Sequence, residues 1–357
     1  MKSSLLILAV CIFALNTTNV MSHHGRSNFL FDAFITLEGK VTDYKWRNPH
    51  VYIELQTTNE NKESETWLIE GGTPSTLKRL GWEKDSIKIG DNVKVVGNPD
   101  RNPKKNFIFL DHIVRENGET FYLKSLRRTD GSVQRPLSVS SENKNILPSH
   151  DFSGTWARGP NNSVTGQYNI PPSNWPLTKR GEEQVARFHE RNNPSYDCKE
   201  RGLPLYNFHP YYLLWMRYED RLEIIPQNSN LIRTPYFTQT THPNDIKPSL
   251  MGHSIAQIDK NGSLLVETFG FPADVKWGLA PGVDSSEQKH IRARYTLTNN
   301  GFGMDVSIIL EDPVYLSEPV TINGSYIKVA DISFEPYSCD LENARRALSP
   351  PQNTPKE

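Results

Sequence analysis

Histidine and carboxylate side chains gather around one predicted β-hairpin in the second half of the chain. His253 precedes the first strand of this hairpin, Glu267 lies in the second strand, and Asp274 and His290 follow along the chain. An imidazole next to a carboxylate is the minimum for general acid–base chemistry, because the carboxylate can fix the tautomer of the ring and raise its pKa. We therefore predict a catalytic group made of His253, Glu267, Asp274 and His290.

Aromatic residues accompany this group and predict a site for a small apolar molecule. If His253 is functional, we expect it to face a cavity, with Glu267 or Asp274 orienting its ring. The expected ligand-binding residues are Trp215, Phe269, Phe271 and Trp277. The alternative is that His253 and Glu267 anchor the hairpin through hydrogen bonds and that the aromatic residues fill an ordinary core.

Short-range signals predict the hairpin itself. Residues 255–259 and 264–269 are apolar or alternating runs, and the Asn261-Gly262 pair between them supplies the positive φ angles of a tight turn. The sequence contains no nucleophile elbow, HExxH, CxxC, P-loop or GxGxxG motif. The residues therefore indicate acid–base chemistry without identifying a reaction.

The chain begins like a secretory signal peptide. Lys2 precedes the apolar run 5–15, which is too short to span a bilayer, and the small residue Ser22 stands at the expected cleavage site. We expect removal of residues 1–22 and a secreted or periplasmic location. No later segment approaches about 20 consecutive apolar residues, so no transmembrane segment is expected after processing.

Histidines near the new amino terminus predict a metal site. Cleavage after Ser22 would leave His23 first, with His24 beside it, and a free α-amino group next to an imidazole is a ready chelator of Cu(II). His50, held by Pro49 at the mouth of a predicted strand, can supply another nitrogen. Cleavage before Ser22 would instead give a flexible copper site, and all three histidines can also be ordinary solvated or turn residues. Copper is the only cofactor that the residues indicate.

Charge and cysteine content narrow the function further. The chain carries 40 Lys and Arg against 41 Asp and Glu, a formal net charge of −1, so nothing favours nucleic acid or an anionic membrane as a partner. Cys11 lies in the signal segment, which leaves Cys198 and Cys339 in an oxidising compartment. A disulfide between them is the most economical arrangement, the alternative being two buried free thiols.

The predicted fold is all-β with two domains. Residues 23–126 contain short alternating strands and a single helix, which predict a small barrel of the oligonucleotide/oligosaccharide-binding (OB) type. Residues 127–150 are poor in large apolar side chains and predict a linker. Many strands over 151–345 predict a larger, lipocalin-like antiparallel barrel, and 346–357 is expected to be a disordered tail.

Motifs in both halves also resemble bacterial exported families. His23-His24 and Asn48-Pro49-His50 lie in a region similar to an uncharacterised family, a domain of unknown function whose members carry such motifs. Gly252-His253-Ser254 and Pro336-Tyr337-Ser338-Cys339 resemble a domain often found behind the first one. The resemblance implies the architecture and the pairing of the two remaining cysteines, and it brings no reaction.

Three functions follow as alternatives. The first is an exported small-molecule-binding protein, or an enzyme that acts on an apolar substrate through His253 and Glu267. The second is a periplasmic copper-binding protein that uses its mature amino terminus. The third is a structural or interaction protein without catalysis.

We predict that His23 and His50 bind Cu(II) only in the processed protein, because the ligand set needs the free amine of His23. Calorimetric titration with CuCl₂ should show tight binding by the processed chain. Binding should weaken in a Met-extended form and in His50→Ala. Equal copper affinity in all three proteins would refute this site.

Overall fold

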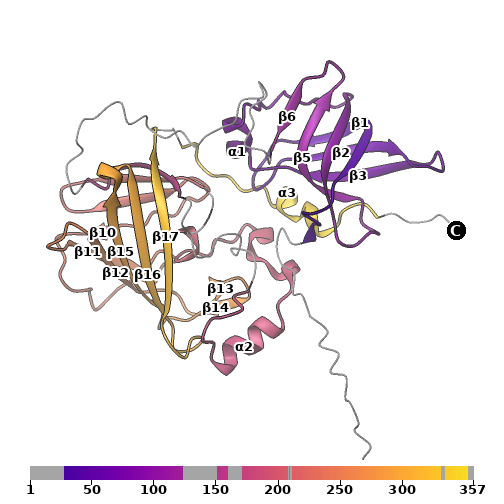
Figure 1. Cartoon of the computed structure of the whole chain (residues 1–357). Helices are drawn as coiled ribbons and strands as arrows, with labels where there is room; N and C mark the ends of the chain where they lie inside the picture. Colours follow the sequence, from indigo (N-terminus) through magenta and orange to yellow (C-terminus); the bar gives the residue numbers. More distant parts are fainter. Residues whose placement is uncertain are drawn as a thin grey trace, which may run out of the picture.

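The computed structural model describes residues 28–123, 151–159, 171–207, 209, 211–330 and 334–352. These residues form two β-barrels that follow each other along the chain (Figure 1). The predicted all-β fold with two barrels is therefore confirmed. The signal segment, the first two histidines and the predicted linker 127–150 lie outside the described residues. No helix in the described part of the chain is long and apolar enough to cross a membrane.

The first barrel is closed by pairing between strands distant in the sequence. Its sheet has the order β3-β2-β1-β4-β5-β6, and an additional parallel pairing of β3 with β5 closes the first five strands into a barrel. This order, with a helix between β3 and β4, is that of an OB-type barrel. Its elements are β1 (Ile35–Lys45), β2 (Tyr52–Thr58), β3 (Ser64–Glu70), α1 (Pro74–Arg79), β4 (Asn92–Pro99), β5 (Phe107–Arg115) and β6 (Thr120–Tyr122).

Local sequence signals explain the helix of this barrel. The Thr73 side chain accepts a hydrogen bond from the Thr76 amide at 3.1 Å, so it caps α1, and Pro74 occupies the first turn. Gly81 follows the helix with a φ of 88°, a left-handed angle that costs a glycine little. The helix covers one end of the barrel and buries Leu77 against its core.

The second barrel is a nine-stranded sheet with the order β10-β11-β12-β15-β16-β17-β7-β8-β9. Isolated bridges between the β9 region and the segment around β10 bring its two edges together, so the barrel is nearly closed. Strand neighbours pair antiparallel except β10 with β11. Its strands are β7 (Gly154–Arg158), β8 (Leu213–Arg217), β9 (Leu222–Pro226), β10 (Pro235–Tyr236), β11 (His253–Ile258), β12 (Leu264–Phe269), β15 (His290–Thr298), β16 (Gly303–Glu311) and β17 (Val320–Val329).

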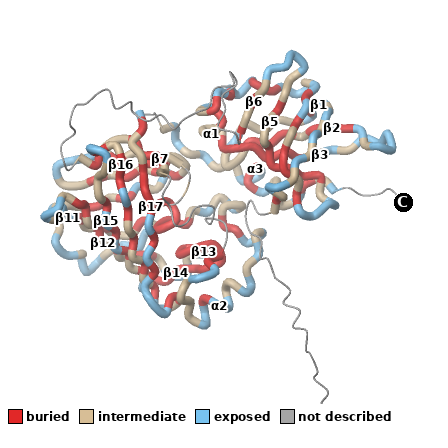
Figure 2. Tube along the Cα trace, in the orientation of Figure 1, coloured by how far each residue is buried: buried red, intermediate tan, exposed pale blue. Residues whose placement is uncertain are grey.

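Smaller elements complete the second domain outside the barrel. A separate two-stranded sheet pairs β13 (Val275–Ala280) with β14 (Val283–Ser285), next to α2 (Lys179–Ala186). Single turns of 3-10 helix follow α2 at Glu190–Asn192 and Pro194–Asp197, and others lie at Leu205–Asn207, Asn299–Gly301 and Arg346–Leu348. Figure 2 shows that burial is concentrated along the barrel strands and that exposed residues lie at the outer loops and hairpin ends.

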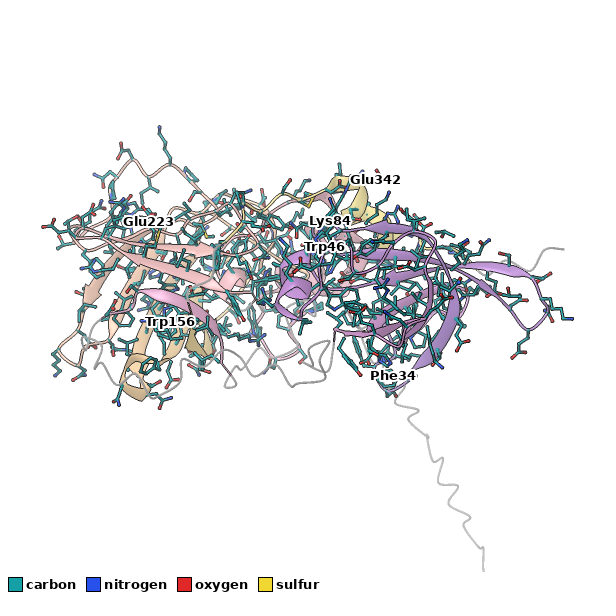
Figure 3. All side chains as sticks on the ribbon, turned by 90° about the horizontal axis from the view of Figure 1, so that it is seen from above. Phe34, Trp46, Lys84, Trp156, Glu223 and Glu342 are labelled. Carbon is teal, nitrogen blue, oxygen red and sulfur yellow. A yellow bond between two sulfur atoms is a disulfide. The ribbon has the colours of Figure 1, made fainter. Side chains whose placement is uncertain are left out.

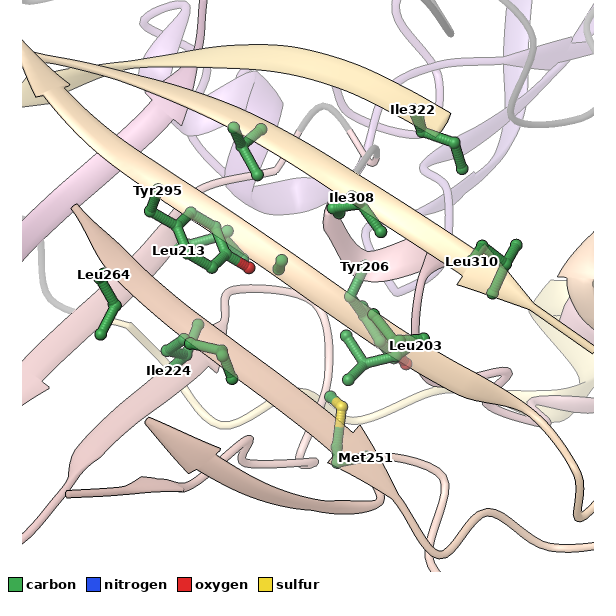
Figure 4. Packing of buried hydrophobic residues seen from close by; sticks show 14 of the residues in the cluster. Leu203, Tyr206, Leu213, Ile224, Met251, Leu264, Tyr295, Ile308, Leu310 and Ile322 are labelled. Carbon is green, nitrogen blue, oxygen red and sulfur yellow. The ribbon is translucent and has the colours of Figure 1, made fainter. Parts of the chain in front are cut away.

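The two-residue period of a strand decides which side chains enter the second barrel. Ser254 and Thr268 are buried inside, whereas their neighbours His253 and Glu267 lie on the outer face of the sheet. The interior is a packed apolar core, into which side chains project from neighbouring strands (Figure 4). A polar centre within it is Arg233, which donates to the Tyr295 hydroxyl and to Thr268 Oγ1, each at 2.9 Å.

The C-terminal segment 334–352 leaves the second barrel and returns to the first (Figure 1). It contains α3 (Leu341–Arg345), and Arg346 donates to Asp43 at 2.7 Å and to Glu54 at 3.1 Å on the first barrel. Figure 3 shows the labelled Glu342 of this segment and Trp46 of the first barrel close to the junction between the two barrels. The prediction of a disordered tail from residue 346 therefore differs from the structure up to residue 352, because Arg346 finds two carboxylates to bind.

A disulfide fastens this segment. Cys198 and Cys339 are bonded, with 5.8 Å between their Cα atoms, so the predicted pairing is confirmed. Cys198 follows the 3-10 turn Pro194–Asp197, and Cys339 forms a bridge with Asn48 in the loop after β1. The bond therefore joins the wall of the second domain to the C-terminal segment that contacts the first barrel.

We predict that the double variant Cys198→Ser/Cys339→Ser loses about 5 kcal/mol of unfolding free energy. In the chain-entropy model this is the cost of opening a loop of 141 residues. Urea unfolding of the variant and the oxidised protein, followed by tryptophan fluorescence, measures the difference. Indistinguishable midpoints and slopes would show that the bond adds no stability.

Candidate functional site

A pocket of about 190 Å³ lies where the two barrels meet. The first barrel lines it with the loop after β1 and with residues of β2 and β3, namely Pro49, His50, Tyr52 and Glu70. The opposite wall belongs to the second domain and the C-terminal segment, and includes Glu190, Tyr196, Arg201, Tyr206, His209, Tyr211 and Tyr337. Ionisable and phenolic side chains thus converge on one pocket from segments far apart in the sequence.

The pocket occupies the face that OB barrels use for ligands. Such barrels bind with the surface of their second and third strands and with the loops between strands 1 and 2 and between strands 4 and 5. Here Asn48, in the first of these loops, forms a bridge with Cys339, and Lys105, in the second, forms a bridge with Gln352. The second domain and its C-terminal segment therefore cover the surface with which an isolated OB barrel would bind its ligand.

Glu190 is an acid with a raised pKa at the pocket wall. Its Oε1 accepts hydrogen bonds from Asn193 Nδ2 at 2.9 Å and from the Tyr196 hydroxyl at 3.4 Å, while its buried Oε2 has no partner among the described residues. Burial raises the pKa of Glu190 to about 7, against the lowering effect of Asn193 and Arg201. Glu190 is therefore partly protonated near neutral pH, as a general acid or base should be.

Arg201 and His209 form the basic side of the pocket. Arg201 is 6 % exposed, and its Nη2 lies 3.4 Å from His209 Nε2. Burial, followed by repulsion from Arg201, lowers the pKa of His209 to about 3, so this ring is neutral at pH 7 and its Nε2 can accept from the guanidinium. Burial also lowers the pKa of Arg201, but a guanidinium stays charged in proteins. The pocket therefore holds a buried positive charge.

His50, the predicted copper ligand, lies in this pocket. Its Nδ1 is 3.8 Å from Glu70 Oε1, and the Tyr52 hydroxyl lies 3.3 Å from Glu70 Oε2. Asn28, the first described residue, lines the same pocket, whereas the two histidines that precede it by four and five positions lie outside the described residues. Among the side chains that the structure describes, no group of three or more His, Cys, Asp and Glu is arranged to hold a metal ion.

Three of the predicted catalytic residues meet on the outer face of the second barrel. Strand pairing sets His253 opposite Phe269 and His290 opposite Glu311, and Glu267 precedes Phe269 by two residues on the same face of β12. His290 Nε2 lies 3.0 Å from Glu267 Oε1, and its Nδ1 lies 2.8 Å from Glu311 Oε2. The imidazole of His290 is therefore held between two carboxylates.

A further histidine joins this group from the loop that precedes β11. His242 Nδ1 lies 2.9 Å from His253 Nδ1, and His242 Nε2 lies 3.9 Å from Glu267 Oε2. Phe269 stacks on His290 with 3.9 Å between ring centroids, and Tyr236 stacks on His253 at 5.6 Å. We call His242, His253, Glu267, His290 and Glu311 the outer-face cluster.

The structure does not bring the predicted aromatic ligand-binding residues together around His253. Trp215 and Phe271 are buried in the interior core, on the opposite side of the sheet from His253, whereas Phe269 lies beside the histidines. Trp277 belongs to β13 and stacks on Phe188 with 5.1 Å between centroids. The expected cavity fails because residues 253 and 254 face opposite ways in a strand.

Asp274 also stands apart from the other predicted catalytic residues. It lies before β13 in the separate small sheet, and its exposed carboxylate forms an ion pair with Arg180 at 3.6 Å. An exposed pair of this kind contributes little to stability and gives no orientation to His253. Asp274 is therefore removed from the candidate catalytic group.

Sequence reasoning missed His242 and Glu311 on the outer face and Glu190, Arg201 and His209 in the pocket. A signal existed for Glu311, because the turn at Asn299–Gly301 between two predicted strands sets the register that pairs it with His290. The pocket residues gave no such signal. They meet the first barrel only through folding of the whole chain.

Comparison with known proteins finds a similarity to a family over the first part of the chain. Residues 12–108 match a family of unknown function, DUF6152. The matched range contains the His-His and Asn-Pro-His motifs and ends within β5, so it covers a minority of the chain. No curated protein matches the sequence. The similarity is therefore confined to the region of the first barrel, and it indicates no activity.

We predict that Glu190 makes the protein less stable as pH rises. Its folded pKa of about 7 lies above the ordinary value of 4.5, so its stabilising contribution is complete below pH 4.5 and is lost as pH rises through 7. The unfolding free energy should fall by about 3 kcal/mol from this group alone.

Urea unfolding at pH 5 and pH 8 tests this, and Glu190→Gln should reduce the difference between the two values. The exposed Glu183 of α2 supplies the control, since Glu183→Gln should leave the difference unchanged. An unaltered pH dependence in Glu190→Gln would contradict the raised pKa.

Proposed function

We propose that the protein is an exported small-molecule-binding protein and that the pocket between its barrels takes a small molecule with a carboxylate group. The proposal moves the binding site away from the second barrel, where His253 and Glu267 face outward. The single observation that carries it is the buried guanidinium of Arg201 at the pocket wall.

Arg201 favours an anionic ligand because its charge is incompletely balanced. Its Nη1 is buried and has no hydrogen-bond partner among the described residues. The acid that acts on it, Glu190, is itself only partly ionised near neutral pH, since its pKa is about 7. An unpaired buried charge is costly, and a carboxylate is the group that a guanidinium binds best.

The rest of the pocket indicates a ligand with one ring or a body of similar size. A cavity of about 150 Å³ in another protein holds benzene, so the 190 Å³ available here admits a slightly larger molecule. Tyrosine rings line the walls, and a phenol offers an apolar face together with a hydrogen-bonding hydroxyl. Glu190 can exchange a proton with a bound ligand, which makes acid–base catalysis chemically available.

Calorimetric titration with benzoate and 4-hydroxybenzoate, with benzyl alcohol as the uncharged counterpart, tests the proposal. The carboxylates should bind, and Arg201→Gln should weaken their binding by roughly 10- to 100-fold, the range expected for a hydrogen bond to a charged group. Benzyl alcohol should bind weakly to both proteins.

Arg115→Gln is the matched control, since Arg115 pairs with Glu119 at 3.0 Å on the surface of the first barrel. It should leave carboxylate binding unchanged. Two results would overturn the proposal: no carboxylate binding tighter than ~10 mM, or equal binding by Arg201→Gln and the native protein.

Copper binding is a second candidate function for the same pocket. The observation that favours it is that Asn28 lines the pocket together with His50. A chain spans at most about 3.5 Å per residue, so His23 can lie up to ~18 Å from Asn28 and can reach His50. The copper titration of the three amino-terminal forms tests it independently of Arg201.

Export is part of the proposal and rests on two features. The first 22 residues have the composition of a cleaved signal, and the disulfide is the pairing expected in an oxidising compartment. Amino-terminal sequencing of protein from the periplasm and the medium would test it, since an intact Met1 terminus would exclude processing.

A further inference from the structure

We propose that His242, Glu267 and His290 bind a divalent transition metal, with zinc as the reference ion, on the outer face of the second barrel. This site is separate from the pocket between the barrels and uses none of the histidines near the amino terminus. Its three donors come from the loop before β11, from β12 and from β15.

The position of His290 is the first argument. Both of its ring nitrogens face carboxylates, Glu311 at 2.8 Å and Glu267 at 3.0 Å. A neutral imidazole carries one N–H, so if Nδ1 donates to Glu311, the lone pair of Nε2 points at an oxygen of Glu267. A cation between Nε2 and Glu267 converts this repulsive contact into two bonds.

The orientation of His242 is the second argument. Its Nε2 is buried, has no hydrogen-bond partner among the described residues, and lies 3.9 Å from Glu267 Oε2. A buried ring nitrogen that faces a carboxylate without a hydrogen bond to it is available as a metal ligand.

The separations between donors fit a metal of this size. Zinc bonds of 2.0–2.2 Å to nitrogen and oxygen place neighbouring ligands of a tetrahedral site about 3.3 Å apart. Here His290 Nε2 lies 3.0 Å from Glu267 Oε1, and His242 Nε2 lies 3.9 Å from Glu267 Oε2. The second separation is longer than 3.3 Å, so the His242 ring must move toward Glu267 to close the site. The need for this movement agrees with the finding that, among the described residues, no group of three or more His, Cys, Asp and Glu is already arranged to hold a metal ion.

The surrounding side chains orient the ligands as in known metal sites. A histidine ligand usually donates its other N–H to a carboxylate or another acceptor, which fixes its tautomer. Glu311 does this for His290, and His253 meets Nδ1 of His242 at 2.9 Å. Phe269 contacts both rings, stacked on His290 at 3.9 Å and edge-on to His242 at 5.0 Å. We therefore assign His253 and Glu311 as positioning residues.

Two histidines and one carboxylate leave a coordination position open, which is the ligand set of catalytic rather than structural zinc. Glu267 also lines a groove of about 520 Å³ on the outer face, where Ile255, Leu265 and Ile309 provide an apolar floor. An apolar substrate in that groove would lie beside the open position. The competing arrangement is a metal-free one, in which a protonated His290 bridges Glu267 and Glu311.

Metal analysis of the full processed protein separates these arrangements. After dialysis against ZnCl₂ and removal of loosely held ion, elemental analysis of the native protein should show one zinc per chain. This zinc should be absent in His290→Ala and in the isosteric Glu267→Gln. Glu311→Gln should keep the ligands and weaken zinc binding by roughly 10- to 100-fold in calorimetry. Thermal melts of each variant confirm that it is folded.

His112→Ala is the matched control. His112 also has a carboxylate partner, Asp111 at 2.8 Å, but it lies on the first barrel, so this variant should keep the full zinc content. His50→Ala should likewise keep the zinc bound at the outer-face cluster. Zinc content unchanged in His290→Ala and Glu267→Gln, or no zinc binding tighter than ~1 mM, would establish the metal-free arrangement instead.

Discussion

The disulfide between Cys198 and Cys339 is the constraint on which the site between the barrels depends. Cys198 lies between Glu190 and Arg201 in the chain, and the bond links this stretch to the C-terminal segment. That segment contacts the first barrel at Asn48, through Cys339, and at Asp43, through Arg346. Hydrogen bonds also hold the segment against the second domain, among them Arg345 to Asp197 at 2.6 Å and Arg191 to the Leu348 carbonyl at 2.7 Å. The covalent bond adds to these contacts, which together keep the second domain beside the OB-type surface.

A buried cation without a full set of hydrogen-bond acceptors distinguishes the pocket from the rest of the described interior. Lys289, whose pKa burial lowers to about 7, donates to the Leu203 carbonyl at 2.9 Å and to the Gly278 carbonyl at 3.3 Å. Arg233 is likewise surrounded by hydroxyl groups. These two cations have protein acceptors and serve packing, whereas Arg201 keeps a nitrogen without one. That difference is why the carboxylate ligand is proposed for the pocket and not for the interior of the second barrel.

The outer-face cluster shows that the alternation of side chains along a strand can place ionisable residues on the opposite side of the sheet from the barrel interior. One face of β11 and β12 carries Ser254 and Thr268 into the core, and the other carries His253 and Glu267 outward. The histidines of this cluster lie outside the barrel and are partly buried there by neighbouring side chains, so their chemistry differs from that of a group inside the barrel. The loop that brings His242 completes the cluster from outside the sheet.

The sequence by itself determined the elements and their type. Alternating strands, the Asn261-Gly262 turn, the Thr73 cap and the even count of mature cysteines predicted both barrels, the hairpin, the helix and the disulfide, because each depends on interactions between neighbours or on a single pairing choice. It also brought His253, Glu267 and His290 to one place, since strand register follows from short turns.

Only the tertiary structure decided which faces and segments meet. The aromatic cavity expected beneath His253 failed because a one-residue step reverses a side chain across the sheet. The pocket of Glu190, Arg201 and His50, and the return of residues 346–352 to the first barrel, join parts more than a hundred residues apart. Such contacts depend on the packing of whole domains, and no local pattern of residues encodes them.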